Sequence, residues 1–229
     1  NLSSPLDTTS GNNTPTGIYF SNDGSKVFVL GSNGNGGDRD SIIEYSLSTA
    51  YDVSTASGTT QSLIVDGGIG SVLGFTSLHP FGLTFNGDGS KVYVADGNLD
   101  KIFEITLGSN FDLTSSATHT GTLNTDVSNG SDTPCGLTFN NDGSKLFLAG
   151  FADQEIVYWS LSTDYDIDTE GSANFFDLTP YKTASHFKPR DVDFNSDGTR
   201  MYVVDFNSDR IVIFKLDNAF DLSLSLIHI

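Results

Sequence analysis

The stretch "NGDGSKVYVAD", residues Asn86–Asp96, decides the fold of this 229-residue chain. An Asp-Gly pair follows one β-rich run and precedes another, in which apolar residues dominate. Glycine takes a positive φ without a Cβ clash, and Asn and Asp favour turns through hydrogen bonds between side chain and backbone. The stretch therefore predicts a tight hairpin, with a type I turn closed by a glycine bulge at Gly89.

Nearly the same phrase occurs four times, at residues 14–31, 79–96, 133–150 and 188–205. Each copy continues into a second shared stretch, such as "DKIFEITLGSNFDLT" (residues 100–114), and the first three continue into a looser third one. Each unit is thus expected to be a four-stranded antiparallel meander. The predicted units are residues 14–67, 79–126, 133–181 and 188–223. We expect the basic residue after each turn on the solvent side, at Lys26, Lys91, Lys145 and Arg200.

The strands carry large residues on both faces, as in Val92, Tyr93 and Val94. A sheet that is buried on both faces lies between neighbours, and four strands per unit match a β-propeller blade. The predicted fold is an all-β propeller with four visible blades, in one domain over residues 1–229. A β-sandwich is the alternative, although its strands would alternate more cleanly. No segment shows a sustained helical period, so helix is expected to be nearly absent.

The units share the pattern P-x-G-[IL]-x-F-x-x-D-G-[ST]-[KR]-x-[FY]-V, with small departures. Its carriers include Pro80, Gly82, Asp88 and Gly89. This pattern resembles the YVTN repeat of lactonase-like and surface-layer β-propellers. The resemblance implies the propeller fold and leaves the activity open, since such propellers serve as enzymes, binders and surface proteins. The fourth unit departs at Asp191, where the other units have glycine.

The last six residues, "LSLIHI" (Leu224–Ile229), resemble a translated transposon end used to prepare sequencing libraries. We therefore expect a sequencing-adapter artefact, in which case the gene is a metagenomic-type fragment and its parent carries more blades. Two alternatives stay open. The hexapeptide could be a genuine final strand, or residues 1–9 could supply the missing strand and close a four-bladed ring.

The formal charge of −18, from 29 acids and 11 bases, argues against a nucleic-acid surface and an anionic membrane surface. No apolar run approaches the roughly 18 residues of a membrane helix, and the single Cys135 excludes an intrachain disulfide. The expected partner is a protein, a glycan or a small molecule. The expected location is extracellular, or on a cell or virion surface.

An antiparallel meander sends the repeated turns to one end of the strands and the variable loops to the other. The variable loops include Ser32–Asp40 and Gly67–His79, and such loops commonly carry function. The entries to the innermost strands lie at that end, near the propeller axis. They supply the predicted ligand-binding residues, which are His79, Phe81, Cys135, Lys188, Arg190 and Asp191.

Arg190 could hold a carboxylate or a phosphate, or it could instead pair with Asp191, Asp193 or another acid. Two D-x-N-x-D loops are candidate calcium sites, since Ca²⁺ prefers oxygen ligands. Their residues are Asp96, Asn98 and Asp100, and Asp205, Asn207 and Asp209. Both loops lack the glycine and the distal glutamate of an EF-hand, so solvated turn acids are the alternative. No other cofactor is expected.

The chain has no H-E-x-x-H, G-x-S-x-G or phosphate-loop motif, so no catalytic residue is assigned. Cys135 is expected to be a packed residue. The leading hypothesis is a non-enzymatic binding or surface module. The alternative is a lactonase-like hydrolase with an axial polar pocket built from His79, Arg190 and Asp191. A purely structural repeat array is the third hypothesis.

Overall fold

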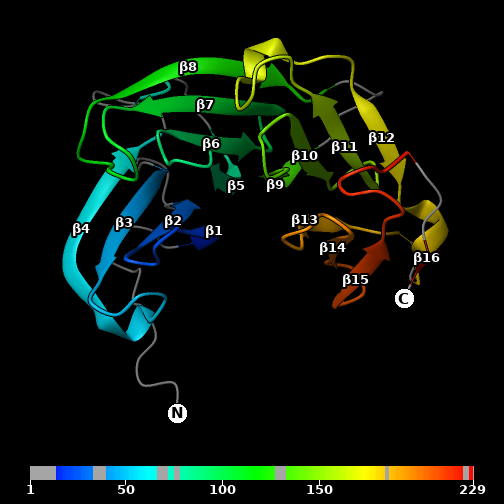
Figure 1. The fold of residues 1–229 in the computed structure, drawn as a ribbon, viewed down its shortest axis with the longest axis horizontal. Helices are drawn as coiled ribbons and strands as arrows, with labels where there is room; N and C mark the ends of the chain where they lie inside the picture. Colours follow the sequence, from blue (N-terminus) through cyan, green and yellow to red (C-terminus); the bar gives the residue numbers. More distant parts are fainter. Residues whose placement is uncertain are drawn as a thin grey trace. The chain divides into compact units, whose positions relative to one another are not determined.

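A computed structural model describes residues 14–32, 40–65, 72–74, 78–126, 133–183, 186–223 and 227–228. These residues form four antiparallel sheets of four strands, as the sequence predicts (Figure 1). Helix among them is limited to three single 3-10 turns, at Val53–Thr55, Ile167–Thr169 and Thr179–Tyr181. The all-β prediction is confirmed.

The strands of each sheet follow one another in chain order. The first sheet holds β1 (Thr14–Phe20), β2 (Lys26–Ser32), β3 (Ser41–Leu47) and β4 (Ala56–Ile64). The second holds β5 (Pro80–Phe85), β6 (Lys91–Asp96), β7 (Lys101–Leu107) and β8 (Ala117–Asn124). The third holds β9 (Pro134–Phe139), β10 (Lys145–Gly150), β11 (Glu155–Ser160) and β12 (Asn174–Asp177). The fourth holds β13 (Pro189–Phe194), β14 (Arg200–Asp205), β15 (Arg210–Lys215) and β16 (Ile227–His228).

The short β16 pairs with β15, through Phe214 with His228 and Lys215 with Ile227. Residues 1–13, 224–226 and 229 lie outside the described residues. The adapter interpretation and the ring-closing strand from residues 1–9 therefore stay predictions.

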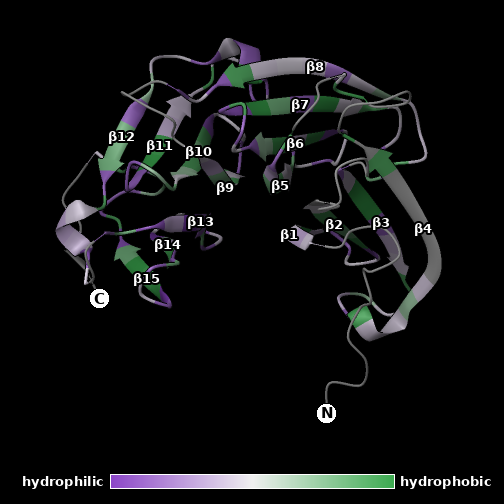
Figure 2. Ribbon diagram, turned by 180° about the vertical axis from the view of Figure 1, so that it is seen from behind, coloured by the Kyte–Doolittle hydropathy of each residue, from purple (hydrophilic) through white to green (hydrophobic). Residues whose placement is uncertain are grey.

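The chain divides into two compact units. One comprises residues 1–94 and 103–120, and the other comprises residues 95–102 and 121–229. In the first unit β5 packs on β1 and β2, and in the second β13 packs on β9 and β10. The same aromatic pair marks both contacts, since the ring centroids lie 4.6 Å apart in Phe28–Phe85 and in Phe147–Phe194. The third strands of sheets, such as β3 and β15, are largely hydrophobic (Figure 2).

The predicted turn conformation at Gly89 is confirmed. Its φ is +76°, and its backbone N–H donates to the carbonyl of Asn86 at 3.1 Å. The Asp88 carboxylate accepts the N–H of Ser90 at 2.9 Å. The ring of Phe111, itself at φ 53°, covers the glycine so closely that a Cβ on Gly89 would lie 2.3 Å from it. The second repeated turn thus closes over the first.

The prediction that Lys26 lies on the solvent side is wrong. Its ammonium group lies 2.6 Å from the buried carboxylate of Glu44 and donates to the carbonyl of Phe111 at 2.6 Å. The equivalent Lys91 pairs with buried Glu104 at 2.8 Å. A carboxylate on the next strand therefore draws each lysine inward along the sheet.

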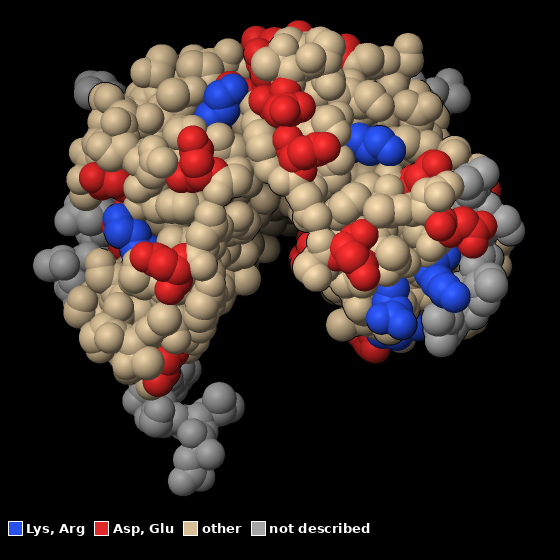
Figure 3. Space-filling view, viewed as in Figure 1, with Lys and Arg blue, Asp and Glu red and all other residues tan. Residues whose placement is uncertain are grey.

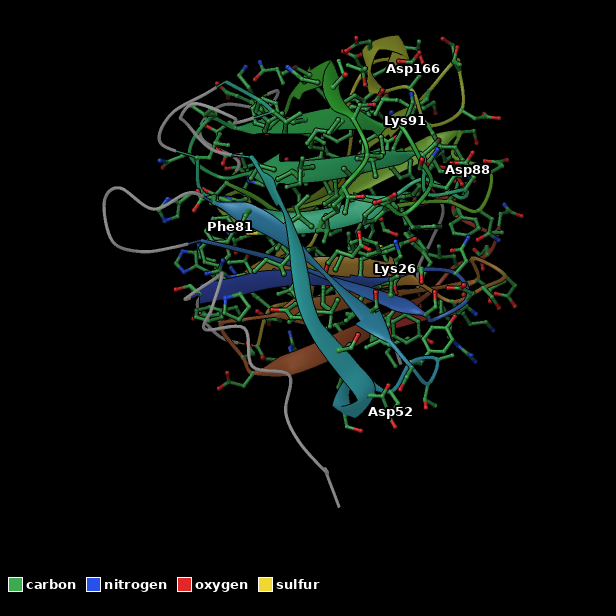
Figure 4. The ribbon with its side chains drawn as sticks, turned by 90° about the vertical axis from the view of Figure 1, so that its left-hand side faces the viewer. Lys26, Asp52, Phe81, Asp88, Lys91 and Asp166 are labelled. Carbon is green, nitrogen blue, oxygen red and sulfur yellow. The ribbon has the colours of Figure 1, made fainter. Side chains whose placement is uncertain are left out.

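The repeated turns lie at one end of the strands and the entries to the first strands lie at the other. In the first unit, Lys26, Asp52 and Asp88 lie at one end of the strands and Phe81 lies at the other (Figure 4). Most of the variable loops Ser32–Asp40 and Gly67–His79 lie outside the described residues. Acidic side chains are spread over the face drawn in Figure 3, with fewer basic ones among them.

Candidate functional site

Arg190 is the extra residue of a β-bulge at the start of β13. Pro189 pairs with Asp205 and Asp191 pairs with Val204, so Arg190 has no counterpart on β14. β9 is irregular at the same place, because Pro134 pairs with Gly150 while the next regular pair is Leu137 with Leu148. Bulges redirect side chains and are common beside functional sites. Here the irregular positions are those of the candidate residues Cys135 and Arg190.

The bulge brings the Arg190 guanidinium to Cys135, with 3.7 Å between Nη1 and Sγ. Cys135 is 1% exposed and its thiol also donates to the carbonyl of Thr133 at 3.4 Å. Burial raises the pKa of Cys135 to about 11, even though the Arg190 charge acts in the opposite direction. The thiol is therefore protonated near neutral pH and is a poor nucleophile.

Two aromatic rings hold the Arg190 side chain. Its guanidinium carbon lies 4.3 Å from the ring centroid of Phe151 and 4.9 Å from that of Phe206. The Lys188 ammonium also lies over Phe151, at 4.6 Å. Cation–π contacts of this kind attract a cation to the ring face and so orient the side chain. We name Lys188, Arg190, Phe151 and Phe206 the basic–aromatic cluster.

Asp191 stands where the other repeats have glycine, and it packs against the aligned Gly136 of β9. A Cβ on Gly136 would lie 1.9 Å from Oδ1 of Asp191 and 2.6 Å from its Cα. Asp191 is exposed to solvent on one side, but partial desolvation by the surrounding protein atoms raises the pKa of its carboxyl group to about 6. The Asp193 charge adds to this rise, and the N–H of Val192, which donates to Oδ1 at 2.9 Å, opposes it.

A carboxylate with this pKa is mostly ionised at pH 7 and still accepts a proton readily, as a general base must. The charge of Asp191 also raises the pKa of the Cys135 thiol, whereas the charge of Arg190 lowers it. The side chains of Cys135, Arg190 and Asp191 therefore interact electrostatically. The structure thus brings together Cys135, Lys188, Arg190 and Asp191 at one end of the second unit.

His79 and Phe81 belong to the first unit, at the start of β5. Their rings lie 6.0 Å apart, and the His79 side chain is exposed. At the aligned position of β1, the Thr16 hydroxyl donates to the carbonyl of Pro80 at 2.9 Å. The role predicted for His79 and Phe81 in ligand binding stays a prediction.

The D-x-N-x-D spacing has a structural explanation in the turns after β6 and β14. The Asp96 carboxylate accepts the N–H groups of Asn98 and Leu99, at 3.1 and 2.8 Å. The Asp205 carboxylate accepts the N–H of Lys188 at 3.1 Å and pairs with Arg210 at 3.2 Å. Burial alone would raise the pKa of Asp205, but these hydrogen bonds lower it overall.

Across the described ranges, no three His, Cys, Asp or Glu side chains come close enough to hold a metal ion. Calcium binding at Asp96, Asn98 and Asp100, and at Asp205, Asn207 and Asp209, stays a prediction. A calcium titration followed by thermal unfolding tests it.

Phe151 and Phe206 are not among the site residues predicted from the sequence. They follow β10 and β14, and the aligned residues of the first two repeats are Ser32 and Gly97. Only two of the four repeats have an aromatic residue here, and in both it stands three residues before an acidic or amide side chain. This pattern is a weak signal of a functional site. Its importance appears only with the position of Arg190.

The repeated four-stranded sheets, each packed by its inner strand on the sheet before it within a unit, define a β-propeller. The family model described as "Lactonase, 7-bladed beta-propeller" matches residues 75–222, more than half of the chain. The chain therefore belongs to this lactonase propeller family, and the propeller prediction is confirmed.

Solved structures share the fold at low sequence identity. The periplasmic gluconolactonase PpgL of Pseudomonas aeruginosa is 16% identical with a TM-score of 0.61, and the match covers 95% of this chain and 56% of that one. A Bacteroides fragilis protein assigned as a 6-phosphogluconolactonase is 16% identical with a TM-score of 0.59, covering 98% and 72%. A Lactobacillus plantarum protein is 16% identical with a TM-score of 0.56, covering 98% and 75%.

The chain thus spans little more than half the length of PpgL. No curated protein matches the chain significantly. None of the helices in the described ranges is long and apolar enough to cross a membrane.

Proposed function

We propose that this chain contributes the site of a lactonase-type propeller that hydrolyses sugar-acid lactones. The leading hypothesis from sequence is a binding module, whereas the family match favours the alternative, a hydrolase. PpgL is described as a gluconolactonase, which suggests the substrate class. The observation that carries the proposal is Asp191, an accessible carboxylate with a pKa near 6 beside Arg190 in the basic–aromatic cluster.

In this proposal Asp191 takes a proton from water while the water oxygen attacks the lactone carbonyl carbon. The tetrahedral intermediate carries a negative oxygen, which the Arg190 guanidinium stabilises. The ring C–O bond then breaks, and the proton held by Asp191 goes to the departing ring oxygen. The product is the open hydroxy acid, whose carboxylate Lys188 and Arg190 attract.

The test is hydrolysis of glucono-δ-lactone by the 229-residue chain, followed by acid release and corrected for the spontaneous reaction. Asp191→Asn is expected to lower kcat at least about 100-fold, the usual effect of losing a general base. Asp193→Asn is the matched control, since Asp193 lies on the same strand and its pKa is also raised by burial. It is expected to keep kcat within about twofold.

The pH profile is a second readout. The rate is expected to rise with pH and to level off above about pH 6.5, since only ionised Asp191 accepts a proton. His79→Ala tests the third candidate residue. A folded chain that is inactive on a panel of lactones and esters would reject the hydrolase in favour of a binding module.

The basic–aromatic cluster supports anion binding as a second candidate function. Lys188 and Arg190 both lie over Phe151, so they present two positive charges on one aromatic support. Gluconate, an anion that cannot be hydrolysed further, is the probe. Binding by calorimetry that Arg190→Met abolishes, without turnover of any lactone, would favour a binding module. A change in stability alone would favour a structural repeat array.

Two further proposals concern the setting of the protein. PpgL is described as periplasmic, which supports a location outside the cytoplasm for this chain, and fractionation of source cells followed by immunodetection of the chain tests it. The surface-layer subtype of the repeat is proposed from the motif alone. Immunolabelling of the chain on intact source cells tests that subtype.

A further inference from the structure

The third sheet lacks a carboxylate that the first two sheets hold beside a lysine. In the first sheet, Glu44 is 5% exposed and pairs with Lys26 at 2.6 Å, and the second sheet repeats this ion pair. The strand register places Tyr158 of β11 at the position that Glu44 holds on β3. The lysine is nevertheless kept, as Lys145 at the start of β10. The third sheet therefore has the cation of this pair without the anion.

The Glu44 carboxylate shows what the missing group does. Its Oε1 pairs with Lys26 of the same sheet, and its Oε2 accepts the N–H of Leu113 from the next sheet at 2.9 Å. Lys26 in turn donates to the carbonyl of Phe111 in that next sheet. One planar carboxylate thus takes one donor from each sheet, and the lysine adds a second connection between them.

The equivalent donors are present between the third and fourth sheets. Lys145 donates to the carbonyl of Phe220 at 2.9 Å, the same contact that the lysine of the first sheet makes. Leu222, which aligns with Leu113, is 5% exposed, and its N–H has no acceptor among the described residues. None of the ion pairs in the described ranges includes Lys145. A buried donor without an acceptor costs free energy, so these groups favour a ligand that supplies one.

The neighbouring side chains leave this position to a ligand. The Asp221 carboxylate accepts the N–H and the hydroxyl of Ser223, at 2.9 and 2.6 Å. Burial raises the pKa of Tyr158 and the Asp221 charge adds to this rise, so the phenol keeps its proton and can donate. The Tyr158 ring stacks on that of Phe147, with 5.9 Å between centroids. Tyr158 and Lys145 are both partly exposed, which gives a ligand access from solvent.

We propose that Lys145, Tyr158 and the N–H of Leu222 form a binding site for a small free carboxylate. One carboxylate oxygen pairs with the Lys145 ammonium group, and the other accepts the Leu222 N–H, as the two oxygens of Glu44 do in the first sheet. The Tyr158 hydroxyl donates a further hydrogen bond. The bound acid then joins the third sheet to the fourth.

Two observations select this ligand class. A carboxylate matches two separate donors with its two oxygens, which a spherical anion such as chloride does not. The low exposure of Leu222 favours a small acid over an acidic side chain of another protein. The site is also separate from the basic–aromatic cluster, because Lys145 begins β10 whereas Phe151 follows the other end of that strand.

The test is a titration of the 229-residue chain with sodium acetate at pH 7, compared with sodium chloride at equal ionic strength. Binding is followed by the NMR chemical shift of the Leu222 amide and by the melting temperature. Acetate is expected to shift this amide in a saturable way and to raise the melting temperature, since a ligand that binds only the folded state stabilises it. Chloride is expected to do neither.

Variants assign the effect to the site. Lys145→Met is expected to weaken acetate binding at least about tenfold, because it removes the charged donor. Tyr158→Glu restores the internal carboxylate, so it is expected to melt higher than the native chain without acetate and to lose the acetate response. Lys215→Met is the matched control, since Lys215 is an exposed lysine on β15. It is expected to keep the acetate affinity within about twofold.

An acetate response that persists unchanged in Lys145→Met or in Tyr158→Glu overturns the proposal. Equal shifts of the Leu222 amide with acetate and chloride overturn the assignment to a carboxylate. If Tyr158→Glu does not fold, the comparison of Lys145→Met with Lys215→Met still decides the result. Lactone hydrolysis does not enter these measurements, so their outcome is independent of the proposed function.

Discussion

The Nζ atom of Lys26 lies 2.6 Å from Oε1 of Glu44, while Oε2 of the same carboxylate accepts the N–H of Leu113 at 2.9 Å. One ion pair on the first sheet therefore reaches two backbone groups of the next sheet, since Lys26 also donates to the carbonyl of Phe111. The pair is both a bond within a sheet and a connection between sheets.

Loss of Lys26 is expected to destabilise the chain, because it leaves the buried Glu44 charge without its cation. Lys26→Met is expected to cost about 2–3 kcal/mol, less than a fully buried pair because Lys26 is partly exposed. Lys145→Met is the control, since Tyr158 stands where Glu44 does and only one hydrogen bond is lost. That variant is expected to cost about 1 kcal/mol. Urea denaturation measures both, and equal losses would contradict the buried-charge explanation.

Substitution of Gly89 is expected to destabilise the turn for two separate reasons. Its φ of +76° disfavours a branched side chain, and a Cβ would lie 2.3 Å from the Phe111 ring. Gly89→Val is expected to cost about 2 kcal/mol or more. Gly74→Val separates the two effects, since Gly74 has φ +69° and no atom within 4 Å of a Cβ. An unchanged melting temperature for Gly89→Val would show that the turn differs from the one described.

The raised pKa of Asp191 predicts that ionisation of this side chain lowers the free energy of unfolding. Its folded pKa, about 6, exceeds the ordinary 3.8, so stability from this residue is full below pH 4 and is lost as the pH rises to 6. Asp191→Asn is therefore expected to be more stable than the native chain at pH 7, by about 1 kcal/mol after allowance for solvent screening. The two chains are expected to be equally stable at pH 4. Urea denaturation at both pH values tests this, and equal stability at pH 7 would rule out the raised pKa.

Acid is expected to weaken the repeated turns for the opposite reason. The N–H of Ser25 and the hydroxyls of Ser21 and Ser25 donate to Asp23 and lower its pKa to about 2. A lowered pKa gives stability that is present above pH 4 and lost as the pH falls through 2. The melting temperature is expected to fall between pH 4 and pH 2, and to fall less steeply in Asp23→Asn. An identical slope in both chains would contradict this role of Asp23.

The Cys135 thiol is expected to react slowly in the folded chain. Burial raises its pKa to about 11, so the thiolate is scarce at pH 8. Reaction with a disulfide reagent is expected to be at least about 100-fold slower in buffer than in urea. Cys135→Ala is expected to leave lactone hydrolysis within about twofold of the native rate. A large loss of activity without a loss of stability would instead make the thiol part of the chemistry.

The strands could be predicted from the sequence because the same strand–turn–strand pattern occurs in all four repeats, with Gly89 and its equivalents at the turns. The sequence also predicted that Cys135 and Arg190 belong to one end of the sheets, since both open an innermost strand. The ion pair of Lys26 with buried Glu44 could not be predicted from the sequence, because the register between β2 and β3 decides which side chains meet. The contact of Arg190 with Phe151 and Phe206 could not be predicted either, since a β-bulge redirects the Arg190 side chain and no local sequence pattern specifies that bulge.

Each turn glycine is covered by an aromatic residue of its own sheet, as Phe111 covers Gly89 and Tyr165 covers Gly143. The aromatic cover of each of these glycines is therefore supplied by the same repeat. Gene duplication can copy such a unit whole, and only the few side chains between sheets must then be adjusted. Changes in repeat number are accordingly an easy evolutionary step for this architecture, and a single copy can also diverge in sequence, as at Asp191, where the other repeats have glycine.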